Sequence, residues 1–447
     1  MENYIRKVKI RSLFEVNNNL EIQFVEKTNC IFGENGTGKT TIINLIVSTL
    51  NCDLKILSSI PFVSIEIMTA KIGTKRARKS IFVNKINNEE IEFHIYEKNI
   101  HEKFNTQLDQ RVNLKKISII IDGLNDILNL TYVPLNRLNS NDLNIDHPEE
   151  YILNRALRAR HLPNEEVLGI LDPSRRMLSS IEKEFINRYA LIQDRINKDS
   201  DEMKNNIVRR TLIDDDFLQK SDEFSTKIQS KRSIGSKKYD PTEIMKKFKH
   251  ANIDISSEPL ENHFRLWEKV TNEFELARDK YDNNDKSSLR EFTQTYYRKF
   301  SMLVLFEKFT SILSDIEKLE NNKNRYLKQF NETEEIINEF FLPRKSFEFD
   351  NKGAFLVKSN GKNVELFNLS SGEKHLIALL GRVSLLSSDA SVFVADEPEL
   401  SLHLEWQRPL IKSMRKLSPY LQIIVATHSP AIIPSDSNQI DLEDCKI

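Results

Sequence analysis

A short glycine-rich segment near the amino terminus combines the residue types that hold a phosphate chain. The 447-residue chain has only 11 glycines, yet three of them fall within the segment Gly33–Thr40, whose letters are GENGTGKT. Glycines let the backbone wrap around a triphosphate so that its N–H groups point inward, and Lys39 of this pattern reaches the β and γ phosphates. The hydroxyl of Thr40 is then placed to ligate Mg²⁺. The segment therefore predicts a site for a nucleoside triphosphate such as ATP, together with Mg²⁺.

The flanking residues decide between this interpretation and a glycine turn that merely caps a helix. Thr28–Phe32 (TNCIF) is a compact apolar run that ends directly at Gly33, as a buried strand would. From Gly38 to Leu50 the apolar residues recur at helical spacing. Strand, glycine loop and helix follow in the order that a phosphate-binding loop needs, which favours the functional interpretation.

Two further polar clusters follow apolar runs near the carboxyl terminus. Val392–Ala395 leads into Asp396 and Glu397, and Ile423–Ala426 leads, through one threonine, into His428. At a strand tip Asp396 can hold Mg²⁺, Glu397 can polarise an attacking water, and His428 can lie near the γ phosphate. Taken alone, the acids would be a solvated turn and the histidine would be structural. Their occurrence together with the glycine loop favours a shared site.

The elements that must position these residues are of three kinds. Residues 55–133 alternate strand-like pieces with polar turns, including 63–67, 91–95, 117–121 and 130–133. Between about 140 and 342 the apolar residues recur every three or four positions, and two such stretches, 178–207 and 302–337, could pair antiparallel, with shorter helices broken at Pro241 and Pro259 between them. After Pro343, short strands return, and helix and strand then alternate as in doubly wound folds. Asp441, Glu443 and Asp444 are expected to form a solvated tail.

These shifts in pattern predict an α/β protein with three parts. Residues 1–139 form an amino-terminal lobe with the glycine loop, residues 140–344 a helical insertion, and residues 345–447 a carboxyl-terminal lobe. Lys and Arg total 65 against 66 for Asp and Glu, so no overall basic field indicates nucleic acid or an anionic membrane. The apolar stretches are too short to cross a bilayer, the start lacks a secretory signal and the three cysteines suggest reduced thiols, so we expect a cytoplasmic protein with no membrane partner.

The segment Leu369–Glu373 (LSSGE) is a further motif, and with it the order of the motifs resembles that of a known family. A glycine loop, a long insertion, LSSGE, VFVADEP and IVATH follow one another in this chain. This order resembles that of ABC-type ATPases of the AAA family, in their soluble branch with SMC, RecF and OLD-type proteins, over residues 1–55 and 345–433. The resemblance implies an ABC-type ATPase head, a doubly wound mixed sheet plus an antiparallel β subdomain, with a large helical, partly coiled-coil-like insertion. It also implies hydrolysis of ATP to ADP and phosphate, with slow turnover.

The resemblance carries roles over to individual residues. Asp396 is the Mg²⁺ residue with Thr40, Glu397 is the catalytic base, and His428 is the switch histidine. The signature motif acts in trans, so that one subunit closes over the ATP bound by another in an ATP-sandwiched dimer. Residues implied in nucleotide binding are Gly33, Asn35, Gly36, Gly38, Lys39, Thr40, Thr41, Ser370, Ser371, Gly372 and Glu373. Leu400–His403 corresponds to the D-loop and Tyr132–Arg137 to the Q-loop, while Ser371 and Glu373 stand where transporters usually show Gly and Gln.

The insertion and the carboxyl terminus narrow the resemblance. The insertion has no cysteine for a Rad50-type zinc hook, and no TOPRIM-like cluster of acids follows His428, as an OLD or Gabija nuclease would require. What remains resembles stand-alone ATPases of bacterial anti-phage systems, most the AriA-type subunit of PARIS and next the PtuA-type subunit of Septu. This implies a homo-oligomer, such as a hexamer of dimers, that holds a separate nuclease or toxin of TOPRIM or HNH type until a phage protein triggers its release.

Two clusters of basic residues could bind the molecule that triggers release. An acidic, DNA-mimicking phage protein or DNA itself would suit them, whereas the plain alternative is a solvated loop. A RecF-like or SMC-like DNA-repair ATPase that binds DNA through its helical arm is the competing function. A pure scaffold with a degenerate site is disfavoured, because every catalytic residue type is present. The clusters are Lys75, Arg76, Arg78 and Lys79, and Lys227, Lys231, Arg232, Lys237 and Lys238.

Overall fold

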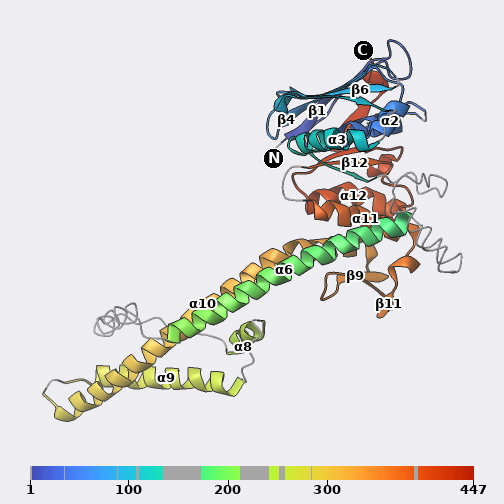
Figure 1. Ribbon diagram of the computed structural model, residues 1–447. Coiled ribbons are helices and arrows are strands. Elements are labelled where there is room, and N and C mark those ends of the chain that lie inside the picture. Colours follow the sequence, from blue (N-terminus) through green and yellow to red (C-terminus); the bar gives the residue numbers. More distant parts are fainter. Residues whose placement is uncertain are drawn as a thin grey trace. The chain divides into compact units, whose positions relative to one another are not determined.

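The structure is a computed structural model that describes residues 3–34, 36–87, 89–106, 110–133, 173–211, 241–250, 257–282, 284–386 and 391–447 (Figure 1). The chain divides into two compact units. The first unit is Met1–Asn187 with Gln329–Ile447, and the second unit is Arg188–Lys328. The domain limits at residues 139 and 344 stay predictions, and the first of them falls within residues 134–172, which lie outside the described part of the chain.

Two sheets form the framework of the first unit. The six-stranded sheet is antiparallel, with Val8, Ile67 and Phe93 among the alternate residues that it buries completely. The five-stranded sheet is parallel throughout, and β13 is buried along its whole length, as expected of a strand covered on both faces. In spatial order the first sheet is β2 (Leu20–Gln23), β1 (Asn3–Arg11), β4 (Ser64–Lys71), β5 (Arg78–Lys85), β6 (Glu90–Ile95) and β7 (Ile100–Asn105). The second is β14 (Asn438–Asp441), β3 (Thr28–Phe32), β13 (Gln422–Ala426), β12 (Ser391–Asp396) and β8 (Asn129–Val133).

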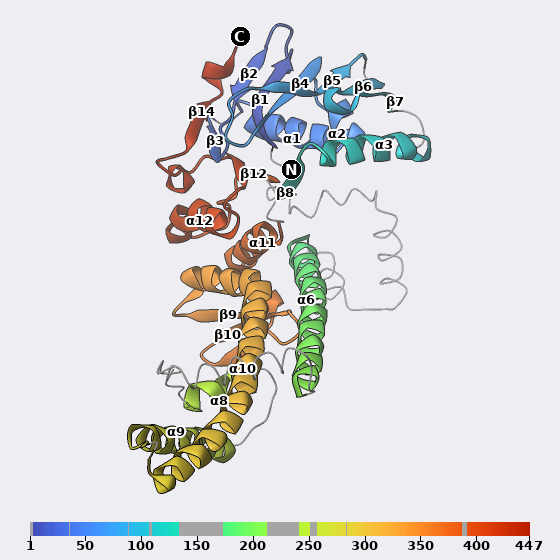
Figure 2. The same cartoon turned by 90° about the vertical axis from the view of Figure 1, so that its left-hand side faces the viewer.

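Helices cover both faces of the parallel sheet, which confirms the predicted α/β class. Figure 2 shows α1 (Lys39–Leu50), α2 (Leu54–Ser59) and α3 (Gln110–Asn125) between the two sheets. Ile42 and Ile43 of α1 join one core with residues of both sheets. On the other face lie α11 (Ser371–Leu385) and α12 (Leu404–Leu417). Parallel and antiparallel pairing are therefore divided between separate sheets.

Two predictions from the sequence were wrong. Residues 117–121 belong to helix α3, not to a strand. The run of isoleucines suggested a strand, but Ile120 and Leu124 are buried while Ile119 is 47% exposed, which is helical spacing. The prediction of a solvated tail at the acidic carboxyl terminus is wrong in that the segment is folded, although Glu443 and Asp444 are exposed. Its residues form β14 and the short helix η4 (Glu443–Cys445), because Ile440 and Leu442 provide buried apolar anchors.

A smaller antiparallel sheet completes the first unit. It consists of β9 (Lys345–Phe349), β10 (Phe355–Ser359) and β11 (Lys362–Val364), followed by the short helix η2 (Leu366–Asn368). Phe347 and Phe349 of β9 contact Phe355 of β10, and the ring of Phe185 lies 5.4 Å from that of Phe330. Aromatic rings of separate chain segments thus form the core of this subdomain.

The second unit is helical, as the periodicity predicts. It contains α8 (Pro241–His250), α9 (Ser257–Asp279) and parts of the long helices α6 (Pro173–Thr211) and α10 (Lys286–Phe341). Asp199 of α6 accepts hydrogen bonds from Asn322 and Tyr326 of α10, at 3.0 and 3.2 Å. Met203, further along α6, packs in one cluster with Ile316 and Leu319, earlier in α10. The two helices therefore pair antiparallel, as expected.

Among the helices that the structure describes, none combines the length and the apolar character needed to cross a bilayer. The remaining short helices are η1 (Tyr96–Lys98) and η3 (Pro430–Ile432).

Candidate nucleotide-binding site

The glycine loop connects β3 to α1, and two of its glycines have left-handed backbone angles. Gly36 and Gly38 have φ angles of 87° and 92°, which side chains on an L-residue rarely allow. Gly38 precedes the first helical residue and offers no side-chain cap, and the first turn of α1 carries no acid. The unpaired N–H groups and the positive end of the helix dipole at this turn together favour an anion. Thr40 and Thr41 lie half-buried in the same turn, whereas Asn35 lies outside the described residues.

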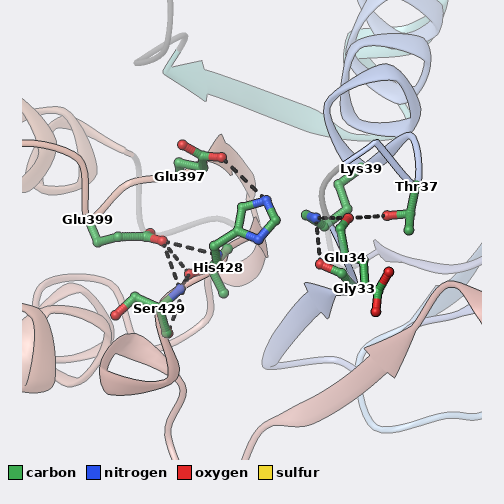
Figure 3. A network of polar contacts seen from close by, with 9 residues as sticks. Gly33, Glu34, Thr37, Lys39, Glu397, Glu399, His428 and Ser429 are labelled. Carbon is green, nitrogen blue, oxygen red and sulfur yellow. Dashed lines mark hydrogen bonds and ion pairs between the residues drawn. The ribbon is translucent and has the colours of Figure 1, made fainter.

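Lys39 is folded back into the loop. Its side-chain amine donates to the carbonyl oxygens of Gly33 at 2.7 Å and Glu34 at 2.9 Å, and the residue is only 6% exposed (Figure 3). Burial lowers the pKa of Lys39, while the nearby carboxylates of Glu397 and Asp396 oppose this shift. Because β13 pairs in parallel with both β3 and β12, the glycine loop and the two acids follow strands that end at the same edge of the sheet.

The acidic motif ends β12 in the way predicted. Asp396 is 3% exposed at the strand tip. Glu397 has a φ of 49°, and its N–H donates to the Ala426 carbonyl at 2.7 Å, which ties it to the neighbouring strand β13. The Glu397 carboxylate lies 3.7 Å from Nε2 of His428 (Figure 3). A non-glycine residue in the left-handed region redirects its side chain from the strand direction, a strained arrangement that is common at functional sites.

Glu399 is a site residue that the sequence interpretation missed. One of its carboxylate oxygens accepts hydrogen bonds from the Thr427 hydroxyl at 2.5 Å and from the N–H groups of His428 and Ser429, both at 3.3 Å. The residue is 8% exposed. Its position in the acidic motif that contains Asp396 and Glu397 was the only signal in the sequence. The carboxylate clamps the loop that carries His428 (Figure 3).

The signature residues have a different environment. Ser370 caps α11 in a capping box with Glu373, which also pairs with Lys345 at 2.8 Å. Burial raises the pKa of the Glu373 carboxyl, but hydrogen bonds from Lys345 and Ser370 outweigh it and lower the pKa overall. A glutamine here would lose the ion pair, which explains why glutamate suits this chain. Ser371 is exposed.

Gly372 packs against the predicted D-loop of the same chain. A Cβ atom built on Gly372 would lie 2.5 Å from the carbonyl oxygen of Ser401, which itself has a φ of 66°. Burial lowers the pKa of His375, and the Leu400 backbone opposes this shift. In Figure 2, α11 and α1 lie on opposite sides of β12. Thus the structure brings Lys39, Asp396, Glu397 and His428 together, but among the described contacts none joins the signature residues to the glycine loop.

A cavity of about 550 Å³ adjoins the glycine loop. Phe14, Glu34, Gly36 and Thr37 are among its lining residues. Phe14 is 51% exposed, and its ring lies 3.2 Å from the Cβ position of Gly38. The size is typical of small-molecule sites, and an exposed aromatic ring at the loop is suited to stacking on a base. The sequence pattern gave no indication of Phe14.

Several predicted features lie apart from this site or outside the described residues. In the first basic cluster, Lys79 lies near the start of β5 and forms an ion pair with Glu66 at 3.0 Å. The second basic cluster, at residues 227–238, lies outside the described residues. So does most of the proposed Q-loop counterpart, although the hydroxyl of Tyr132 donates to Asn44 of α1 at 3.3 Å.

Comparisons with known proteins give short similarities to ATPases. The chain is 32% identical over 94 residues to the retron Vc95 probable ATPase of Vibrio cholerae serotype O1 biovar El Tor, covering 19% of this chain and 18% of that protein. It is 30% identical over 95 residues to the retron Ec83 probable ATPase of Escherichia coli, with the same two coverages. It is 26% identical over 141 residues to the DNA double-strand break repair Rad50 ATPase of Saccharolobus solfataricus (strain ATCC 35092 / DSM 1617 / JCM 11322 / P2), covering 30% of this chain and 16% of that protein. The matches span less than a fifth of each relative's length.

One solved structure and two family models also match the chain. The Smc head domain of Pyrococcus furiosus, with an extended coiled coil and bound to the carboxyl-terminal domain of ScpA, aligns over 96% of this chain and 91% of its own, with a TM-score of 0.40 and 13% identity. The family model described as "AAA domain, putative AbiEii toxin, Type IV TA system" matches residues 230–433. The model described as "AAA domain" matches residues 7–232, which is half of the chain. The chain therefore belongs to the AAA-domain family.

Proposed function

We propose that the protein binds ATP with Mg²⁺ and hydrolyses it to ADP and phosphate. The observation that carries this proposal is the convergence of Lys39 of the glycine loop with the acids that end β12 and with His428. A loop of N–H groups, a buried lysine, two carboxylates and a histidine form the set that phosphoryl transfer to water uses.

Each residue has a distinct task in this proposal. The N–H groups at the start of α1 and the Lys39 amine bind the phosphates. The Thr40 hydroxyl and the Asp396 carboxylate are oxygen donors of the kind that Mg²⁺ prefers, and the ion would neutralise phosphate charge. Glu397 accepts a proton from the attacking water, and His428, adjacent to that carboxylate, donates a hydrogen bond at the γ phosphate. Phe14 stacks on the base beside the loop.

The active unit in this proposal is a dimer. Because the signature residues of one chain face the D-loop and not its own glycine loop, a second copy would supply Ser370 and Gly372 to complete each site. Turnover would then depend on dimer opening and be slow. Higher assemblies, such as a hexamer of dimers, would build on this sandwich.

Two variants test the site. Lys39→Ala should abolish ATP binding, because it removes the charge that faces the phosphates. Glu397→Gln should bind ATP but hydrolyse it at least about 100-fold more slowly, because it removes the base. Light scattering after gel filtration should show a dimer of the Glu397→Gln protein only with ATP and Mg²⁺. Normal hydrolysis by Lys39→Ala would refute the assignment.

A mixing experiment tests the composite site separately. Lys39→Ala and Ser370→Arg chains should each be inactive alone. A mixture should regain activity, since a heterodimer contains one glycine loop and one signature that are both intact. If the mixture stays inactive although light scattering shows that the two variants form a mixed dimer with ATP and Mg²⁺, the site is not shared between chains.

We further propose that the ATPase acts in a bacterial anti-phage system, holding a separate TOPRIM-type or HNH-type nuclease until an acidic phage protein triggers release. The similarity to two retron ATPases supports a role in such systems. PARIS remains the first candidate and Septu the second. Co-expression with the neighbouring gene should give a homo-oligomer that carries a small nuclease-like chain, and a complex that forms without ATP would contradict an ATP-held assembly.

The alternative is a DNA-repair ATPase whose helical arm binds DNA. The similarity to a Rad50 ATPase over 141 residues favours this candidate. Duplex DNA should then accelerate ATP hydrolysis in a salt-dependent manner. An ATPase rate that DNA leaves unchanged would favour the defence role.

A further inference from the structure

The outer face of the edge hairpin β6–β7 carries two histidines and a glutamate that converge on one point. Register pairs His94 with His101 and Glu92 with Lys103. Because side chains alternate along a strand, these four lie on the face opposite to the fully buried Ile91 and Phe93. This cluster belongs to the antiparallel sheet and contains none of the residues assigned to nucleotide binding.

The ligand atoms of the cluster are directed at each other. Nε2 of His101 lies 2.5 Å from one carboxylate oxygen of Glu92, and Nε2 of His94 lies 3.6 Å from the same oxygen. The two imidazole rings are stacked, with centroids 3.8 Å apart and planes inclined by 18°. All three ligand atoms fall within 4.8 Å of one another. A metal with bonds of about 2.0–2.2 Å can join such a set after small side-chain rotations.

We propose that Glu92, His94 and His101 bind a divalent transition-metal ion, with Zn²⁺ as the best fit. Two imidazoles and one carboxylate are borderline ligands that suit Zn²⁺, Co²⁺, Ni²⁺ or Cu²⁺ rather than Mg²⁺ or Ca²⁺. Zn²⁺ commonly takes three such protein ligands plus water. The fit is strengthened by the hairpin backbone, which fixes the register on both strands through the turn Tyr96–Lys98.

The residues around the cluster orient His94, but one of them, Lys103, competes with a metal ion. The His94 ring is flanked by Phe82 and Tyr96, each with its centroid 6.1 Å away, which limits its orientation. Lys103 lies 3.6 Å from the Glu92 oxygen and competes with a cation for this carboxylate. The Lys103 side chain is 64% exposed, so it can turn into solvent when an ion binds.

The location indicates what the ion would do. β7 is the last strand of the six-stranded sheet, so its outer edge has no strand partner within that sheet. A metal bridging β6 and β7 would fasten this edge strand to the sheet and protect an edge that could otherwise pair with another chain. The role that we assign to the ion is therefore that of a structural clip at the edge of the sheet.

Zn²⁺ titration by calorimetry, in excess Mg²⁺ and without ATP, tests the proposal on the full-length protein. The wild type should bind one more Zn²⁺ than the variant His94→Ala/His101→Ala. Each single histidine variant should lose more than about tenfold in affinity. Glu102→Gln, an acid on the same strand that points to the other face, should bind as the wild type does, and Lys103→Met should bind several-fold more tightly.

A second readout separates metal binding from loss of folding. Zn²⁺ should slow amide hydrogen exchange in Ile100–Asn105 of the wild type and leave it unchanged in the double variant, whose exchange elsewhere should match the wild type. Equal Zn²⁺ stoichiometry and affinity in both proteins, or no binding by the wild type at millimolar Zn²⁺, would overturn the proposal and leave a surface ion-pair cluster.

Discussion

At the scale of single residues, Glu399 makes the least expected contribution to the site. It contacts neither the glycine loop nor Glu397 in any described hydrogen bond, yet it fixes the backbone on both sides of His428. Its second carboxylate oxygen is buried without a hydrogen-bond partner among the described residues. A buried carboxylate with half its acceptors unused is costly, which suggests that positioning of the histidine outweighs that cost.

Replacement of Glu399 should therefore affect rate more than binding. For Glu399→Gln we expect kcat to fall up to about 100-fold with a nearly unchanged KM, because the histidine is misplaced while the phosphate loop is intact. Steady-state ATPase kinetics measure both values. Glu405→Gln is the control, since that side chain is 87% exposed. A parallel rise in KM would mean that Glu399 supports nucleotide binding instead.

His375 makes folding stability depend on pH. Its Nε2 atom is buried without a partner among the described residues, and burial lowers the pKa of His375 from 6.5 to about 4. Above pH 6.5 the imidazole is neutral in both states. Between pH 6.5 and 4 only the unfolded chain takes up the proton, so stability falls as the pH falls through this window.

Urea unfolding at pH 7.5 and pH 5 tests this dependence. The wild type should lose about 2 kcal/mol more between these pH values than His375→Gln does. His403→Gln, whose side chain is 73% exposed, is the control and should lose as much as the wild type. If the wild type and His375→Gln lose the same free energy of unfolding, this histidine takes up a proton at pH 5 in the folded state as well.

At the scale of elements, the start of α11, which carries the predicted signature, packs against the predicted D-loop that follows β12. Gly372→Ala would place a methyl group on the rigid backbone carbonyl of Ser401, so we expect a loss of about 1–3 kcal/mol in stability together with lower ATPase activity. Gly381→Ala on the same helix meets only side chains of Ile181 and Phe185 and should stay within about 1 kcal/mol of the wild type. Thermal and urea unfolding measure both, and equal effects would remove the special role of Gly372.

The sequence predicted elements best where one pattern was unambiguous. The glycine loop, the apolar runs that became β3, β12 and β13, and the helical stretches within α6 and α10 were all recognisable. Residues 117–121 were misjudged because a run of isoleucines satisfies both strand propensity and the helical spacing of α3. Phe14 and Glu399 could not be predicted, since their roles depend on contacts with Gly38 and Thr427 that are distant in sequence.

At the scale of the whole molecule, the residues proposed for ATP binding all belong to the first unit. The chain leaves the first unit after Asn187 and returns to it at Gln329. Close to these two points, the ring of Phe185 contacts that of Phe330, so a short glycine–serine linker can replace residues 188–328. The shortened protein should bind a fluorescent ATP analogue with a Kd within about twofold of the wild type, because no ligand group is removed. DNA binding, which the alternative function assigns to the helical arm, should be lost. A large loss of ATP affinity would mean that the second unit completes the nucleotide site.

The strand order of the parallel sheet has a consequence for biosynthesis. β3, which leads into the glycine loop, has β13 and β14 as its two neighbours, and both come about 390 residues or more later in the chain. At ribosomal rates of about 5–20 residues per second, β3 waits roughly 20 to 80 s for a partner. The antiparallel sheet, made of residues before 106, can form meanwhile. During this interval the nascent chain exposes an unpaired apolar strand, so chaperone capture of the growing polypeptide should depend on β3.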